Sequence, residues 1–164
     1  MDDYAVPPIR VASTAFWTWR RFSASWKTID CGPSMTASVT SAPRILIATP
    51  AGHWHEFGAL ACALVASESG WQPYYFGPNL PSEEIVYAAR KVNANALALS
   101  ICHLLNHHKL IGELKRIRRL SEDKLPIFVV GSGADKALAG EESIGVTVVT
   151  VLDDFRHHIE SLET

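Results

Sequence analysis

ILIATPAGHWHEFG, the stretch from residue 45 to residue 58, decides how this chain is expected to fold. It starts with a short apolar run of strand type, Ile45–Ala48, and a helical pattern begins near Phe57. The loop between strand and helix carries two histidines, His53 and His55. Open α/β sheets bind ligands beyond the carboxyl ends of their strands, so this loop is the first candidate for a binding site.

The rest of the chain repeats the same order of strand and helix. Short, mostly apolar runs of strand type lie at Arg44–Thr49, Gln72–Phe76, Ala96–Ile101, Pro126–Val130 and Val146–Val151. Helical patterns follow them at Glu56–Ser69, Pro81–Val92, Leu104–Ser121, Ala134–Glu142 and Asp153–Leu162. Most of the strands are apolar on both faces, which is typical of parallel strands covered by helices. We therefore predict a Rossmann-like α/β fold, with five parallel strands in a doubly wound, flavodoxin-like sheet of order 2-1-3-4-5.

Composition narrows the class of protein. A length of 164 residues predicts one domain, and 48% hydrophobic residues suffice for a core. A net charge of −2 gives no attraction for nucleic acid, so direct nucleic-acid binding is not expected. No apolar run reaches the length of about 18 residues needed to span a membrane, and no secretory signal is visible. The sparse cysteines fit a reducing compartment, and we expect a cytoplasmic protein; they are Cys31, Cys62 and Cys102.

Residues 1–43 differ from the remainder and are predicted to form a largely irregular arm and linker before a domain at 44–164. They hold three of the five tryptophans and end in a stretch rich in serine and threonine. Three interpretations stay open. The segment is a flexible arm or translated leader, with Met35 as the natural start, a short helix that docks on the domain, or an aromatic segment that binds a partner or membrane surface.

Unusual residues gather in three loops of the predicted topology. The loops after the first, third and fourth strands span Gly52–Gly58, Ser100–His108 and Gly131–Asp135, and they contain five of the seven histidines. These loops should meet at one edge of the sheet, near the point where the strand order reverses. The alternative is that they are polar only because loops are usually polar.

Histidines are the first candidates for chemistry in these loops. His53 and His55 form a His-x-His pair that can bind zinc or another transition metal, and His103, His107 or His108 could complete a set. Two exposed loop histidines with no ligand are the alternative interpretation.

A serine and a glycine pair are the other candidates. Gly131 and Gly133 let the backbone approach a ligand closely and could hold a phosphate, or they form only a tight turn. Ser100 ends the third strand and either offers its hydroxyl to a ligand or caps the strand. No nucleophile with an adjacent base stands out, so catalysis by this chain alone is not expected.

Taken together, these pieces resemble the cobalamin (vitamin B12)-binding domain family. That family carries Asp-x-His-x-x-Gly after the first strand, Ser-x-Leu after the third and Gly-Gly after the fourth. The corresponding segments here are His53–Gly58, Ser100–Cys102 and Gly131-Ser132, and the resemblance runs from Arg44 to the C-terminus. The Gly-Pro-Asn-x-Pro segment after the second strand looks most like the cobalamin domains of light-responsive MerR-type regulators.

The resemblance implies a specific mode of binding for adenosylcobalamin or methylcobalamin. His55 would displace the dimethylbenzimidazole base and bind cobalt from below, in the base-off, His-on state. The displaced nucleotide tail would enter a slot beside the first strand, past Gly58. Ser100 would hydrogen-bond the tail, while Gly131 and Gly133 would leave room for it.

Departures from the family motifs have chemical consequences. The aspartate that orients the axial histidine is His53 here, which supplies no negative charge, so His55 should be a less basic ligand. Glu56 could take over the orienting role, and His53 could compete as ligand. Cys102 replaces the leucine and Ser132 the second glycine.

The resemblance also implies that this domain works together with another protein. Our first hypothesis is a stand-alone photoreceptor or cobalamin sensor in transcription regulation, which signals to a transcriptional regulator and brings His103, His107 or His108 to the upper face of cobalt. The second is a corrinoid-carrying subunit of a methyltransferase or mutase whose catalytic domain is a separate chain. The third is a degenerate domain that binds a partner or a simple metal ion.

Overall fold

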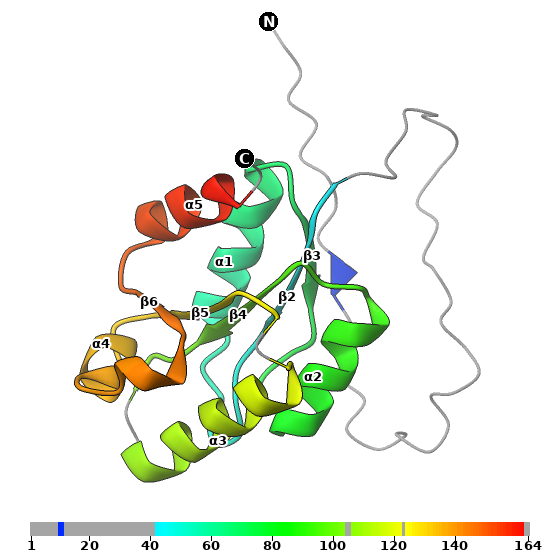
Figure 1. Ribbon diagram of the computed structural model, residues 1–164. Helices are drawn as coiled ribbons and strands as arrows, with labels where there is room; N and C mark the ends of the chain where they lie inside the picture. Colours follow the sequence, from blue (N-terminus) through cyan, green and yellow to red (C-terminus); the bar gives the residue numbers. More distant parts are fainter. Residues whose placement is uncertain (1–9, 12–41, 104–105, 123, 163–164) are drawn as a thin grey trace, which may run out of the picture.

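Parallel strands form the centre of the molecule in the computed structural model, which describes residues 10–11, 42–103, 106–122 and 124–162 (Figure 1). The strands of the expected domain are β2 (Arg44–Ala48), β3 (Gln72–Tyr75), β4 (Ala96–Ser100), β5 (Ile127–Val130) and β6 (Thr147–Val149). They lie in the order β3-β2-β4-β5-β6, which confirms the predicted order 2-1-3-4-5. The predictions for residues 12–41 lie outside the described residues.

A short strand at the edge was not predicted. β1 (Arg10–Val11) pairs in parallel with β3, opposite Tyr74 and Tyr75, and extends the sheet to six strands in the described part of the chain. Two residues are too short a run to show the period of a strand in sequence.

Helices cover both faces of the sheet. They are α1 (Phe57–Glu68), α2 (Ser82–Lys91), α3 (His107–Leu120), α4 (Ala134–Leu138) and α5 (Leu152–Ser161), with a 3-10 turn at Glu142–Ile144. The helices α1 and α5 lie together on one face, and α2 and α3 cover the other (Figure 1). Within the described ranges, no helix is long and apolar enough to cross a lipid bilayer.

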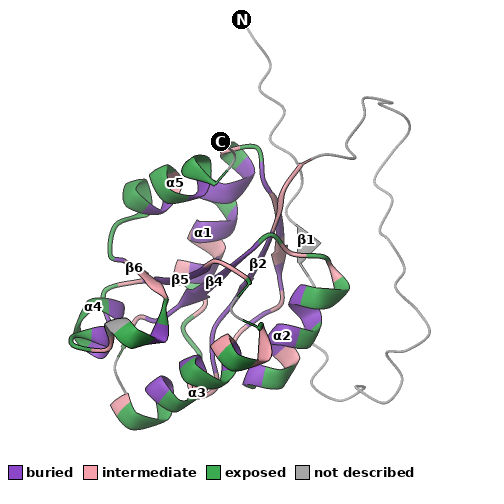
Figure 2. Cartoon of the chain, in the orientation of Figure 1, coloured by how far each residue is buried: buried purple, intermediate pink, exposed green. Residues whose placement is uncertain are grey.

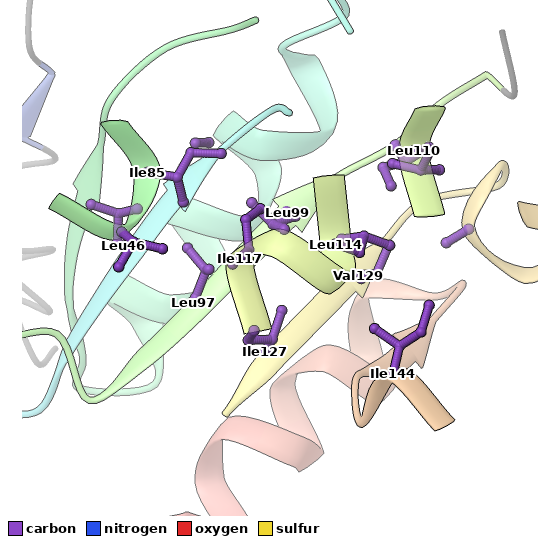
Figure 3. Packing of buried hydrophobic residues seen from close by; sticks show 14 of the residues in the cluster. Leu46, Ile85, Leu97, Leu99, Leu110, Leu114, Ile117, Ile127, Val129 and Ile144 are labelled. Carbon is purple, nitrogen blue, oxygen red and sulfur yellow. The ribbon is translucent and has the colours of Figure 1, made fainter. Parts of the chain in front are cut away.

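The core forms two layers because neighbouring residues of each strand point to opposite faces. Ile45 and Ile47 pack towards α1, whereas Leu46 packs with residues of α2 and α3. Figure 3 shows the second layer, where Leu46 and Leu97 lie against helical side chains such as Ile117. The strands β2, β4 and β5 are buried along nearly their whole length (Figure 2), which explains their mostly apolar sequence. Full burial of one such side chain contributes about 1.5–3 kcal/mol.

Two helix boundaries differ from the sequence prediction by more than one residue, and both have local reasons. The fourth helix ends at Leu138 rather than Glu142, because Gly140 turns the backbone to a φ of +82°. The third begins at His107, where the side chain of Asn106 accepts a hydrogen bond from the Lys109 amide at 3.1 Å. Residues 104–105, where that helix was expected to start, lie outside the described residues.

Candidate functional site

The two histidines of the β2–α1 loop occupy different environments. The side chain of His53 is only 8% exposed, whereas His55 is exposed at the carboxyl edge of the sheet. Burial lowers the pKa of His53, and the nearby charges of Lys109 and His55 lower it further. His53 is therefore a neutral, enclosed imidazole, and His55 is the histidine of this pair that a ligand can reach.

The loop that carries these histidines is held by the loop that follows β3. The side-chain oxygen of Asn79 accepts a hydrogen bond from the Gly52 backbone amide at 2.7 Å. The backbone amide of Asn79 donates to the Thr49 hydroxyl at 2.8 Å. Leu80 donates to the Thr49 carbonyl at 2.9 Å. The Gly-Pro-Asn-x-Pro segment therefore acts as a brace for the histidine loop, and Asn79 is a site residue that the sequence analysis missed.

Asn79→Ala should lower the free energy of unfolding by about 1–3 kcal/mol. The Gly52 amide loses its acceptor, and alanine must adopt a left-handed backbone conformation that asparagine tolerates better. The matched control is Asn93→Ala, since Asn93 also has a positive φ (51°, against 59° for Asn79). Urea denaturation of both variants separates the hydrogen bond from the backbone cost. Equal losses in the two variants would show that the brace adds nothing.

A histidine from the next loop joins His55. The rings of His55 and His103 lie with centroids 4.9 Å apart and planes at 76°, an edge-to-face contact. His107 and His108 form a similar pair with each other, at 5.5 Å. Among the described residues, no group of three or more histidine, cysteine or acidic side chains could hold a metal ion. The polyhistidine metal site considered from the sequence is therefore not assembled there.

Glu56 has a different partner from the one expected. The Tyr75 hydroxyl on β3 donates to a Glu56 carboxylate oxygen at 2.5 Å. Burial raises the pKa of Tyr75, and the hydrogen bond to Glu56 raises it further, so this hydroxyl keeps its proton. The carboxylate is engaged at β3, and among the described residues it accepts no hydrogen bond from His55.

Ser100 and Gly58 form a buried contact directly below this loop. Ser100 is 1% exposed, and its hydroxyl has no hydrogen-bond partner among the described residues. A Cβ atom on Gly58 would collide with that hydroxyl, so any larger residue would close the space above Ser100. An unpartnered buried hydroxyl costs about 1–3 kcal/mol, so this one calls for an explanation. A polar group of a ligand that enters beside Gly58 would supply the missing partner.

Gly131 and Gly133 pack against the protein itself. Gly131 has a φ of +127°, and a Cβ there would collide with the Ile101 carbonyl oxygen. A Cβ on Gly133 would lie 3.0 Å from the Cys102 carbonyl, and the Ser132 hydroxyl donates to the same carbonyl at 3.3 Å. The atoms nearest to a Cβ at either glycine therefore belong to the β4–α3 loop.

Exposed aromatic side chains flank His55. Trp54 is 65% exposed and Phe57 is 83% exposed, which is unusual for rings of this size. The sequence contains both residues within its key motif, but it cannot show which apolar side chains leave the core. They make the edge around His55 apolar as well as accessible.

A cleft elsewhere in the structure is separate from this edge. It has a volume of about 550 Å³ and is lined by residues such as Arg90, Asn95 and Leu125. Asn95 and Leu125 precede β4 and β5, so the cleft lies at the amino ends of the strands. It does not contribute to the histidine site.

The family model described as the B12 binding domain matches residues 43–155. The chain belongs to the B12-binding domain family. Cobalamin is therefore the cofactor of this B12-binding domain, and the buried Ser100 hydroxyl with the open position at Gly58 fits a ligand that inserts beside β2.

Individual relatives give a consistent picture. The domain is 29% identical over 114 residues to ethylmalonyl-CoA mutase of Methylorubrum extorquens, a match that covers 69% of this chain and 16% of the mutase. Two solved structures share the fold, each with a TM-score of 0.58. One is a novel cobalamin-binding protein from Desulfitobacterium hafniense, at 16% identity over 73% of this chain and 58% of that chain. The other is the monomethylamine corrinoid protein of Methanosarcina barkeri, at 18% identity over 76% and 60%. The domain thus spans less than two thirds of each of these proteins.

Proposed function

We propose that this B12-binding domain holds cobalamin in the base-off state with His55 as the lower ligand, and that it presents the cofactor to a partner. The observation that carries the proposal is the buried Ser100 hydroxyl, which lacks a partner beside a glycine that keeps the space open. A domain that bound cobalamin only at its surface would have no need of this buried polar atom. The displaced nucleotide tail is the part of cobalamin that would reach it.

The residues around the site have different roles in binding cobalamin. When bound, cobalamin supplies a cobalt ion that forms and breaks bonds to carbon. His55 would coordinate through a neutral imidazole nitrogen from its exposed loop. His53 is buried and neutral, so it supplies no negative charge to strengthen this ligand. Glu56 is engaged with Tyr75, which leaves the lower ligand without a described carboxylate partner.

A corrinoid-carrying role in a mutase or methyltransferase system is the first candidate for the biological task. The protein that matches by sequence is a mutase, and one of the similar solved structures is a monomethylamine corrinoid protein. The exposed Trp54 and Phe57 beside His55 support the approach of a second protein surface to the cofactor. Catalysis would then take place on a separate domain or chain.

A regulatory role is the second candidate, and the histidine-rich start of α3 favours it. His107 and His108 begin α3 near the same edge, with His107 half-buried and His108 exposed. Such imidazoles could bind cobalt when an upper ligand is lost, for instance in light. The predicted likeness to light-responsive MerR-type regulators rests on the Gly-Pro-Asn-x-Pro segment, which the structure uses as a brace for the histidine loop.

One spectroscopic experiment tests the proposal and separates the two roles. Purified protein is titrated with adenosylcobalamin and methylcobalamin in the dark, and visible spectra are recorded before and after illumination. A base-off, His-on spectrum supports the proposed binding mode, and a base-on spectrum overturns it. A stable spectrum after illumination that differs from that of the photolysed free cofactor favours regulation. Photolysis to the same product as free cofactor favours the carrier role.

Ser100→Ala should change stability and binding in opposite directions. Without cofactor, loss of an unpartnered hydroxyl should leave the free energy of unfolding unchanged or raise it by up to about 1 kcal/mol. Cobalamin affinity should fall by about three- to tenfold, because the tail loses a hydrogen bond. Chemical denaturation and spectral titration measure the two effects, with the exposed Ser143→Ala as control. Unchanged affinity would show that the tail does not reach Ser100.

A further inference from the structure

The ring of His55 has one described side-chain contact that could set its orientation. His103 meets it edge to face, with centroids 4.9 Å apart and planes at 76°. Contacts of this geometry are favourable because the positive edge of one ring faces the negative face of the other. An exposed histidine without such a neighbour rotates freely about its side-chain bonds.

Neighbouring groups that could orient His55 are engaged elsewhere. The Glu56 carboxylate accepts the hydrogen bond of Tyr75. His53 points into the protein, where it is 8% exposed, and its carbonyl accepts hydrogen bonds from Thr49 and Asn79. In the described ranges, no hydrogen bond or ion pair reaches the His55 imidazole, which leaves the His103 ring to restrain it.

The backbone of His103 is itself held in place. A Cβ on Gly133 would lie 3.1 Å from the His103 amide nitrogen, so the two loops are in close backbone contact. The Gly133 amide donates to the Ile101 carbonyl at 3.2 Å, and Ser132 donates to the Cys102 carbonyl. The backbone that carries the His103 ring is therefore held by hydrogen bonds to the carbonyls of the two preceding residues.

We infer that His103 is a positioning residue for the lower ligand. It packs against the His55 ring and limits its rotation, so that one imidazole nitrogen faces outward before the cofactor arrives. A ligand that is already oriented loses less rotational freedom when it binds, and its affinity rises accordingly. The inference rests on the proposed function for its consequence, whereas the contact itself can be tested without cobalamin.

The first part of the experiment uses the full chain without cofactor. Carbon-13 relaxation of the histidine rings measures the mobility of His55 in the wild type and in His103→Ala, His103→Phe and His157→Ala. His157→Ala is the matched control, because it removes an exposed histidine of α5 that has no role in the proposed site. We expect higher mobility of His55 in His103→Ala only. Unchanged mobility in that variant overturns the inference, whatever the cofactor result.

The second part uses the same variants with cobalamin. In nitrogen-15-labelled protein, the nitrogen splitting in the electron paramagnetic resonance spectrum of the cobalt(II) form distinguishes a protein imidazole bound from below from the cofactor's own benzimidazole nitrogen. We expect His103→Ala to bind about two- to tenfold more weakly and with a smaller His-on fraction. His103→Phe should restore both, since a phenyl ring keeps the edge-to-face contact. Failure of phenylalanine to restore them overturns the positioning role.

The two parts keep the inference distinct from the proposed function. If the wild type shows no nitrogen splitting while the ring mobility responds to His103→Ala, the lower ligation by His55 is wrong and the ring contact is real. If the wild type shows the splitting and His103→Ala equals His157→Ala in every measurement, ligation stands and the positioning role is wrong.

Discussion

His55→Ala should abolish the base-off, His-on spectrum and lower cobalamin affinity by about 100-fold. Loss of groups that merely support a metal ligand costs about 10–100-fold in affinity, so loss of the ligand itself should lie at or beyond the upper end of that range. The exposed position of His55 means that the substitution leaves the core intact, and the free energy of unfolding without cofactor should change by less than about 0.5 kcal/mol. Spectral titration and chemical denaturation measure the two quantities.

His108→Ala is the control for this substitution, because it removes an exposed imidazole at the same edge without touching His55. A His108 variant that lost the His-on spectrum while His55→Ala kept it would reverse the assignment of the ligand. An equal and small effect of both variants would show that cobalamin binds without a protein imidazole.

Gly131→Ala should be the most destabilising single-methyl change in the site, with a loss of about 2–5 kcal/mol in the free energy of unfolding. Two costs add up at this position. A φ of +127° is nearly closed to residues with a Cβ, and the added methyl group would collide with the Ile101 carbonyl oxygen. The backbone must shift to relieve the collision, and the hydrogen bond from the Gly131 amide to the Val149 carbonyl would weaken.

Gly112→Ala provides a control of opposite sign. Gly112 lies within α3, and nothing stands within 4 Å of a Cβ built there. Alanine in a helix interior is more stable than glycine by about 0.5–1 kcal/mol, so this variant should unfold at higher urea concentration than the wild type. A Gly131 variant as stable as the wild type would show that the two loops can separate without cost.

The sheet could be predicted because its strands are apolar on both faces. Ile45 and Ile47 face one helical layer and Leu46 the other, and that burial leaves no polar alternation in the sequence. The strand order follows from short right-handed connections between parallel strands. The edge strand Arg10–Val11 and the early end of α4 depend on pairing and on a single glycine, which a periodic pattern does not contain.

The candidate site could be predicted only as a set of residues. The family motif pointed to Ser100 and Gly58, and the structure brings them into contact. The partner of Glu56 could not be foreseen, because Tyr75 lies on another strand and approaches only in the folded chain. The contact between His55 and His103 depends in the same way on how two loops turn at the sheet edge.

The close packing of the β4–α3 and β5–α4 loops has a mechanical consequence. With glycine at residues 131 and 133, the two backbones touch without side chains between them, and the Gly133 amide is bonded to the Ile101 carbonyl at 3.2 Å. Side chains between two loops can change rotamer and absorb a displacement. Two backbones in direct contact cannot do so, and they therefore transmit the displacement. We therefore expect residues 101–103 and the β5–α4 loop to move together, so that a displacement of His103 reaches the first turn of α4 directly.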